Sequence, residues 1–93
     1  MHFVIHGKDK PGQPGLRPAT RPAHVDYLGT FGDRILIAGP LLADDGTPNG
    51  SLIVVDLEDK AAAEAFAAND PYTKAGVFES VAITPWRKAI PKD

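Results

Sequence analysis

Apolar residues along the chain form four short runs and two longer segments with helical spacing, separated by stretches rich in glycine and proline. The short runs predict strands at residues 2–7, 34–39, 51–57 and 77–84. The longer segments predict helices at about 20–32 and 61–69. This β-α-β-β-α-β order is the split βαβ pattern of ferredoxin-like domains. We therefore expect an α+β fold in which two helices cover one face of a four-stranded antiparallel sheet.

The limits of both helices are predicted from capping residues and prolines. Residues 8–18 contain three prolines and two glycines and are expected to be a loop. Thr20 is then a candidate cap for the first helix, and Asp59 for the second. Pro71 disfavours helical geometry at Asp70, so the second helix should end there. On the first helix one face is defined at i, i+3, i+4 and i+7 by His24, Tyr27, Leu28 and Phe31.

The expected strands are apolar at both odd and even positions, as in Ile35-Leu36-Ile37 and in residues 52–55. Both faces of the sheet therefore need cover, although the helices supply it for one face only. Burial of apolar surface contributes about 25 cal/mol per Å² to stability, so a sheet face left exposed to water would lose many kcal/mol of this stabilisation. A second copy of the chain is the simplest cover, and a homodimer is expected. The alternative is that residues 8–18 and the tail at 85–93 fold across that face.

Length, composition and charge argue against several classes of protein. Ninety-three residues suit a single domain over 1–93, and no apolar run is long enough to span a membrane. The N-terminus lacks the pattern of a secretion signal, and the absence of cysteine excludes disulfides and thiol chemistry, so we expect a cytoplasmic protein. The net charge of −2 argues against binding to nucleic acid. RNA-recognition domains share the element order, but the strand at 51–57 lacks the aromatic residues on which they stack bases.

Topology brings two residues together that are far apart in the sequence. His24, near the start of the first helix, and Asp70, at the end of the second, should lie at the same end of the sheet. A carboxylate can fix the tautomer of an imidazole, which then acts as a general base or acid near neutral pH. The alternative is structural, with His24 a buried core histidine and Asp70 a cap of the Asp-Pro turn.

Three further residues are candidates for ligand binding at that end. Arg17 and Arg21 can bind a carboxylate or phenolate, although surface charges would give the same pattern. Ser51 lacks a nucleophile-elbow sequence, so its hydroxyl is expected to form hydrogen bonds rather than react. Without cysteine or a close cluster of histidines and carboxylates, neither a metal site nor a cofactor is expected.

An ordered set of short motifs resembles the YCII-related (YciI-like) family of the dimeric α+β barrel group, over nearly the whole chain. The motifs are Arg21-Pro22-Ala23-His24, Ala38-Gly39-Pro40-Leu41, Gly50-Ser51, Asp70-Pro71-Tyr72, Ala75-Gly76-Val77-Phe78 and Ile83-Thr84-Pro85-Trp86. The resemblance implies a dimer with its sheets packed face to face and an active site on His24 and Asp70. A related member is a dehydrochlorinase of chloroaromatic compounds, but the resemblance names no substrate for this chain.

Two functions are compatible with these observations. The first is a cofactor-independent enzyme that performs isomerisation, elimination or lyase-type chemistry on a small organic anion. His24 would move the proton, Asp70 would orient the imidazole, and Arg17 and Ser51 would hold the ligand. The second is a non-catalytic domain that binds a small molecule in the same cleft and releases it unchanged.

Overall fold

The computed structural model describes residues 1–91 and has the expected α+β architecture. The strands are β1 (His2–Asp9), β2 (Ile35–Leu42), β3 (Pro48–Asp56) and β4 (Phe78–Trp86). They form one sheet in the order β2-β3-β1-β4, in which every neighbouring pair is antiparallel. The helices are α1 (Leu16–Gly29), α2 (Lys60–Asn69) and α3 (Pro71–Ala75), and a 3₁₀ turn at Gly32–Arg34 precedes β2.

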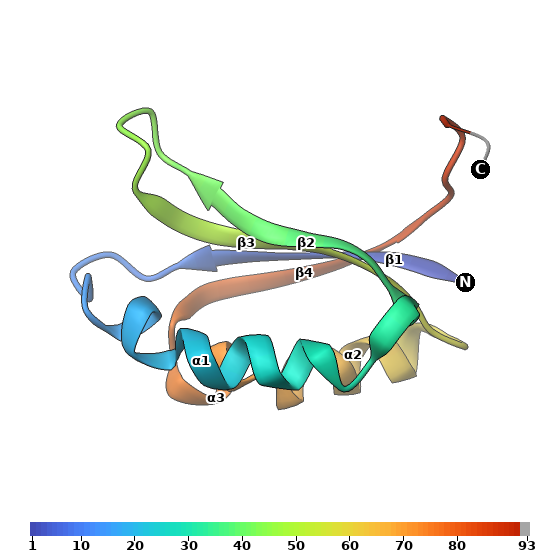
Figure 1. Ribbon diagram of the computed structural model, residues 1–93, viewed down its shortest axis with the longest axis horizontal. Helices are drawn as coiled ribbons and strands as arrows, with labels where there is room; N and C mark the ends of the chain where they lie inside the picture. Colours follow the sequence, from blue (N-terminus) through green and yellow to red (C-terminus); the bar gives the residue numbers. More distant parts are fainter. Residues whose placement is uncertain (92–93) are drawn as a thin grey trace.

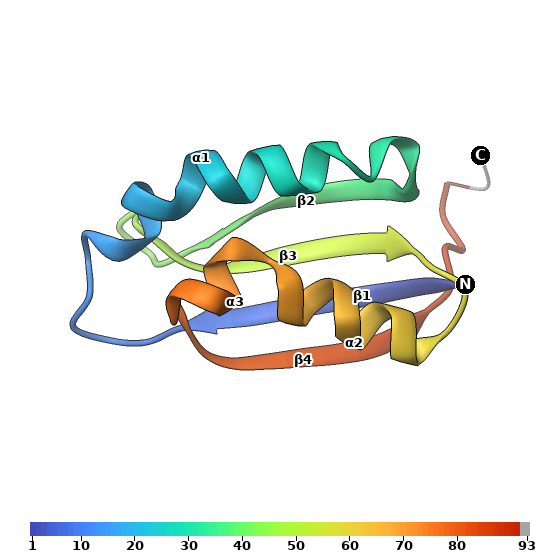
Figure 2. The same cartoon turned by 90° about the horizontal axis from the view of Figure 1, so that it is seen from below.

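All three helices lie on one face of the sheet (Figure 1). Seen from the helix side, α1 runs along β2 and β3, whereas α2 and α3 run along β1 and β4 (Figure 2). The core lies between the sheet and the helices and consists of apolar side chains from both layers. Phe3 and Val55 of the sheet are fully buried, and Phe66 of α2 is buried against them. No helix within residues 1–91 is long and apolar enough to cross a membrane.

The start of the first helix differs from the prediction. It begins at Leu16 rather than near Thr20, so Arg17 and Pro18 belong to its first turn and not to a loop. Proline is tolerated there because the first amide groups of a helix have no partner in the helix. Thr20 is not a cap, since its hydroxyl donates to the carbonyl of Leu16. The prolines and glycines of residues 8–18 predict a loop, but proline is also compatible with the first turn of a helix, and composition does not distinguish the two.

The strands are longer than predicted, and one helix was missed. β2 continues to Leu42 and β3 begins at Pro48, so most of residues 40–50, which the prediction leaves between the two strands, is paired strand with a short turn at 43–47. Helix α3 follows α2 after the single residue Asp70 and is capped at its C-terminus by Gly76, whose φ of 79° suits glycine. The expected cap at Asp59 is confirmed, since its carboxylate accepts from the amide of Ala62.

The second face of the sheet carries no helix (Figure 1). Because side chains alternate along a strand, Phe3 and Ile5 point to the helices and Val4 points to this face. In the register of the sheet, Val4 is opposite Val54, which is opposite Ile37. These three side chains form an apolar row across the sheet, and Ile37 is 60% exposed.

Candidate active site

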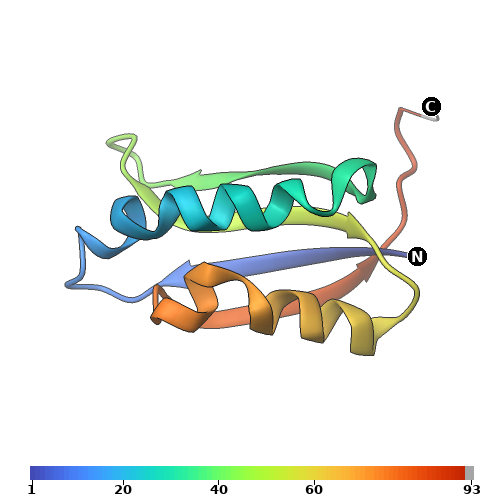
Figure 3. The same cartoon turned by 60° about the horizontal axis from the view of Figure 1, so that its bottom comes forward.

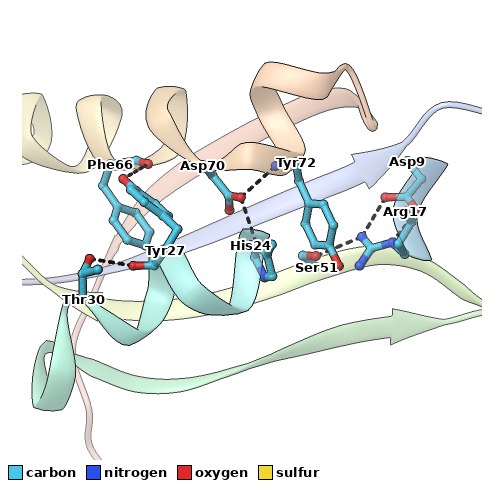
Figure 4. Close-up of polar contacts among 9 residues, drawn as sticks. All are labelled: Asp9, Arg17, His24, Tyr27, Thr30, Ser51, Phe66, Asp70 and Tyr72. Carbon is cyan, nitrogen blue, oxygen red and sulfur yellow. Dashed lines mark hydrogen bonds and ion pairs between the residues drawn. The ribbon is translucent and has the colours of Figure 1, made fainter. Parts of the chain in front are cut away.

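The start of α1, helix α3 and the turn between β2 and β3 gather at one end of the sheet (Figure 3). Arg17, Arg21 and His24 follow one another on α1 at spacings of four and three residues, so they share one face of the helix. Asp70 and Tyr72 come from the junction of α2 and α3, and Ser51 comes from β3. The predicted convergence of His24, Asp70, Arg17 and Ser51 at one end of the sheet is therefore what the structure contains (Figure 4).

His24 and Asp70 form a buried pair. The imidazole Nδ1 lies 2.8 Å from the carboxylate Oδ1, and the residues are 8% and 2% exposed. The same Oδ1 accepts the backbone amide of Tyr72 at 2.9 Å. An ionised carboxylate only accepts hydrogen bonds, so Nδ1 carries the proton and donates it to Asp70. In the neutral imidazole with this tautomer, the lone pair is on the other ring nitrogen, Nε2.

The position of Asp70 follows from its place between two helices. It ends α2, and its extended backbone (φ −62°, ψ 129°) lets its side chain cap the first turn of α3. Pro71 occupies the first position of α3, where proline is favoured. The capping role and the contact with His24 therefore coexist, and the two alternatives left open by the sequence are not exclusive.

Arg17 is held by a carboxylate that the sequence did not single out. Its Nε and Nη2 atoms each donate to Asp9 at 2.8 Å, and Nη2 also donates to the hydroxyl of Ser51 at 2.9 Å. Burial by itself lowers the pKa of Arg17, but the hydrogen bonds and charge of Asp9 outweigh it, and the net pKa is raised. The sequence predicts a loop at Asp9, whereas the residue ends β1, and no local signal marks it as the partner of a residue eight positions later.

Tyr72 is the second residue of the site that the sequence did not single out. Its ring stacks on the imidazole of His24, with centroids 3.9 Å apart and planes 17° apart. The Cζ atom of Arg17 lies 4.6 Å from the centre of the same ring. Burial raises the pKa of the Tyr72 phenol, and the positive charges of Arg17 and Arg21 offset this only in part. Its place in the Asp-Pro-Tyr motif was the one available signal.

These residues border an open pocket of about 1010 Å³ between α1, the β2–β3 turn and the segment before α1. His24, Tyr72, Ser51, Arg17 and Arg21 line it, whereas Asp70 lies behind His24. Arg21 is exposed and forms no ion pair with any residue in 1–91, so its charge is available at the pocket wall.

The arrangement suits proton transfer next to an anion. An oriented imidazole faces the pocket, a carboxylate behind it can stabilise the imidazolium, and arginine charge is close by. Within residues 1–91 no group of three or more histidines, cysteines or carboxylates is placed to hold a metal ion.

Comparison with known proteins gives a consistent relationship over the whole chain. The sequence profile of the YCII-related domain matches residues 1–87. Protein YciI of Escherichia coli O6:H1 is 38% identical over 98 residues, covering 97% of this chain and all of that protein. An uncharacterised protein of Haemophilus influenzae is 36% identical with the same coverage.

Solved structures extend the comparison. The 5-chloro-2-hydroxyhydroquinone dehydrochlorinase of Burkholderia phenoliruptrix AC1100, in complex with 2,5-dihydroxybenzoquinone, superposes with a TM-score of 0.89. It is 33% identical, and each chain covers the other completely. A protein of Bacteroides thetaiotaomicron has a TM-score of 0.60 at 15% identity, and the match covers 99% of this chain and 91% of that chain, which reflects the fold alone.

Proposed function

The chain belongs to the YCII-related family, and from this premise we propose that it is a cofactor-independent enzyme that uses His24 as a general base and acid on a small organic anion. The observation that carries the proposal is the 2.8 Å contact of Asp70 with Nδ1 of an imidazole whose ring lines the pocket. The reaction class is proton abstraction followed by isomerisation or elimination.

Each residue has a distinct task in this reaction. Nε2 of His24 takes a proton from the ligand, and Asp70 orients the ring and stabilises the imidazolium that forms. In an elimination, the electron pair of the broken bond to hydrogen forms a new π bond. The halide then leaves with the electron pair of its bond to carbon, and the proton taken by His24 passes to solvent.

Ligand binding is assigned to the remaining polar residues of the pocket. Arg21 supplies the accessible positive charge, and Ser51 supplies a hydroxyl. Arg17 acts on the ligand through its positive charge and through its hydrogen bond to Ser51, because its Nε and Nη2 groups already donate to Asp9. The related dehydrochlorinase supports a planar, oxygenated ring as the ligand class, since it forms a complex with 2,5-dihydroxybenzoquinone.

The test is release of chloride from 5-chloro-2-hydroxyhydroquinone, measured with a chloride electrode. We expect turnover by the parent protein and a loss of about 10²-fold or more in His24→Asn, the range of general-base catalysis. His2→Asn is the matched control, since His2 lies at the other end of β1 and should leave the rate unchanged. Binding without turnover would support a non-catalytic ligand-binding domain instead, and equal rates in His24→Asn and the parent would refute the assigned base.

We also propose a cytoplasmic homodimer formed through the helix-free face of the sheet. The apolar row of Val4, Val54 and Ile37 supports it because Ile37 is 60% exposed, although Val54 is 3% exposed, and because the described tail does not lie across the sheet but rises away from it (Figure 1). Light scattering should give about twice the 9.9 kDa of one chain. Ile37→Asp should produce monomers, whereas Val25→Asp, at an exposed site on α1, should not. A monomeric parent protein at micromolar concentration would contradict the proposal.

A further inference from the structure

The ring of Tyr72 lies between two functional groups of α1. His24 and Arg17 are seven residues apart, about two turns of one helix face, and Tyr72 occupies the space between them (Figure 4). The stacked imidazole is at 3.9 Å and the guanidinium at 4.6 Å from the ring centre. Tyr72 is 2% exposed, so its orientation is fixed by packing.

The Tyr72 hydroxyl has a proton to give but no acceptor within residues 1–91. It lies beside Arg17 and Ser51 (Figure 4), and the charge and side-chain hydrogen bond of Arg17 partly offset the rise in pKa that burial causes. A guanidinium has no acceptor, so Arg17 cannot take this proton. Because burial raises the pKa of Tyr72, the phenol stays protonated at neutral pH.

Tyr72 nevertheless borders the pocket, although only 2% of the residue is exposed. Ser51 is in a similar position, because its oxygen accepts from Arg17 and its own proton has no acceptor among the same residues.

We propose that the hydroxyls of Tyr72 and Ser51 form a pair of hydrogen-bond donors for one oxygen substituent of the ligand, next to the imidazole of His24. The preferred group is an oxyanion, such as a phenolate, an enolate or a polarised quinone oxygen, because two neutral donors and the nearby guanidinium all favour negative charge. The proposal rests on the proposed function and adds a substrate-contacting residue to it, so Tyr72 is more than a support for the imidazole.

Two variants distinguish the contribution of the Tyr72 hydroxyl from that of its ring. Tyr72→Phe removes only the donor and keeps the stack on His24, whereas Tyr72→Leu removes both. The matched control is Tyr27→Phe, since the Tyr27 hydroxyl donates to the carbonyl of Phe66 at 2.8 Å and lies outside this pocket. Binding of 2,5-dihydroxybenzoquinone is measured by calorimetric titration, and the imidazole of His24 is followed by ¹⁵N NMR.

We expect Tyr72→Phe to weaken binding of this probe about tenfold, the scale of one hydrogen bond to a charged group. The His24 ring nitrogens should keep the chemical shifts of the parent protein in this variant and change only in Tyr72→Leu. Tyr27→Phe should bind as the parent does.

The outcomes separate this proposal from the proposed function. Unchanged affinity in Tyr72→Phe, together with weaker binding in Arg21→Ala, would overturn the donor role and leave the anion-binding pocket intact. An equal loss in Tyr72→Phe and Tyr27→Phe would also overturn it. If the parent protein does not bind the probe at millimolar concentration, both the donor pair and the proposed ligand class fail.

Discussion

Asp9 and Arg17 form a two-pronged ion pair in which both carboxylate oxygens accept from the guanidinium at 2.8 Å. Their side chains are only 16% and 10% exposed, so each charge depends on the other for compensation. The pair joins the end of β1 to the first turn of α1 and fixes the floor of the pocket. Arg17 is therefore first a structural element, and in the proposed function it acts on a ligand through its positive charge and through Ser51.

Removing the charge of Asp9 should destabilise the protein strongly. Asp9→Asn leaves the Arg17 guanidinium in a largely buried site without a counterion, and we expect a loss of about 3 kcal/mol in the free energy of unfolding. Glu79→Gln is the matched control, since its 3.5 Å contact with Lys8 is exposed and worth less than about 1 kcal/mol. Urea unfolding gives the free energy of unfolding of both variants. Equal losses would show that burial does not make the Asp9–Arg17 pair more important than the exposed pair.

The charge and the capping role of Asp70 should be separable. Asp70→Asn keeps an oxygen that accepts from the amide of Tyr72, and asparagine caps helices as well as aspartate does. Thermal unfolding should therefore change little, whereas chloride release should fall about 10²-fold, because a neutral amide stabilises an imidazolium poorly.

Asp70→Ala loses the cap as well, at a cost of about 1 kcal/mol. A fully active Asp70→Asn variant would mean that Asp70 only caps α3.

Gly50 is required where β1 and β3 come together next to Ser51. A Cβ at this position would lie 2.7 Å from the backbone oxygen of Gly7, which cannot move without disturbing the sheet. We expect Gly50→Ala to cost about 1–3 kcal/mol, as overpacked sites do. Gly39→Ala, where a Cβ would meet no atom within 4 Å, should change the free energy of unfolding by less than about 0.5 kcal/mol. Similar Tm values for the two variants would contradict this reading of the strand contact.

Tyrosine ionisation should limit stability at high pH. Burial raises the pKa of Tyr72, and burial together with the charge of Asp70 raises that of Tyr27. The folded state thus holds these phenols neutral at a pH where the unfolded chain ionises them. The free energy of unfolding should be constant with respect to these groups below their ordinary pKa of about 10 and fall as pH rises through their raised folded-state pKa.

Tyr72→Phe removes its share of this dependence, so its stability should decline less steeply with pH than that of the parent. Urea titrations over a series of alkaline buffers give the slope directly. An identical slope in the two proteins would show that Tyr72 ionises as readily in the folded state as in the unfolded chain.

Local pattern was sufficient for the order of strands and helices and for the meeting of His24 with Asp70. Alternating apolar positions locate strands, helical spacing locates α1 and α2, and antiparallel topology then brings the first half of α1 and the end of α2 to one end of the sheet. The first turn of α1 and helix α3 were missed because proline and glycine usually mark loops. Here Pro18 and Pro71 lie in the first turns of helices, where their missing amide hydrogen costs nothing.

The amino-acid sequence by itself determined the fold class, the family and the candidate base with its carboxylate, because each depends on residue type and order along the chain. Only the tertiary structure decided the partners within the pocket. It paired Arg17 with Asp9, which leaves Arg21 as the accessible charge, and it placed Tyr72 between Arg17 and His24. Such contacts depend on side-chain directions across three separate elements, and no spacing in the sequence encodes them.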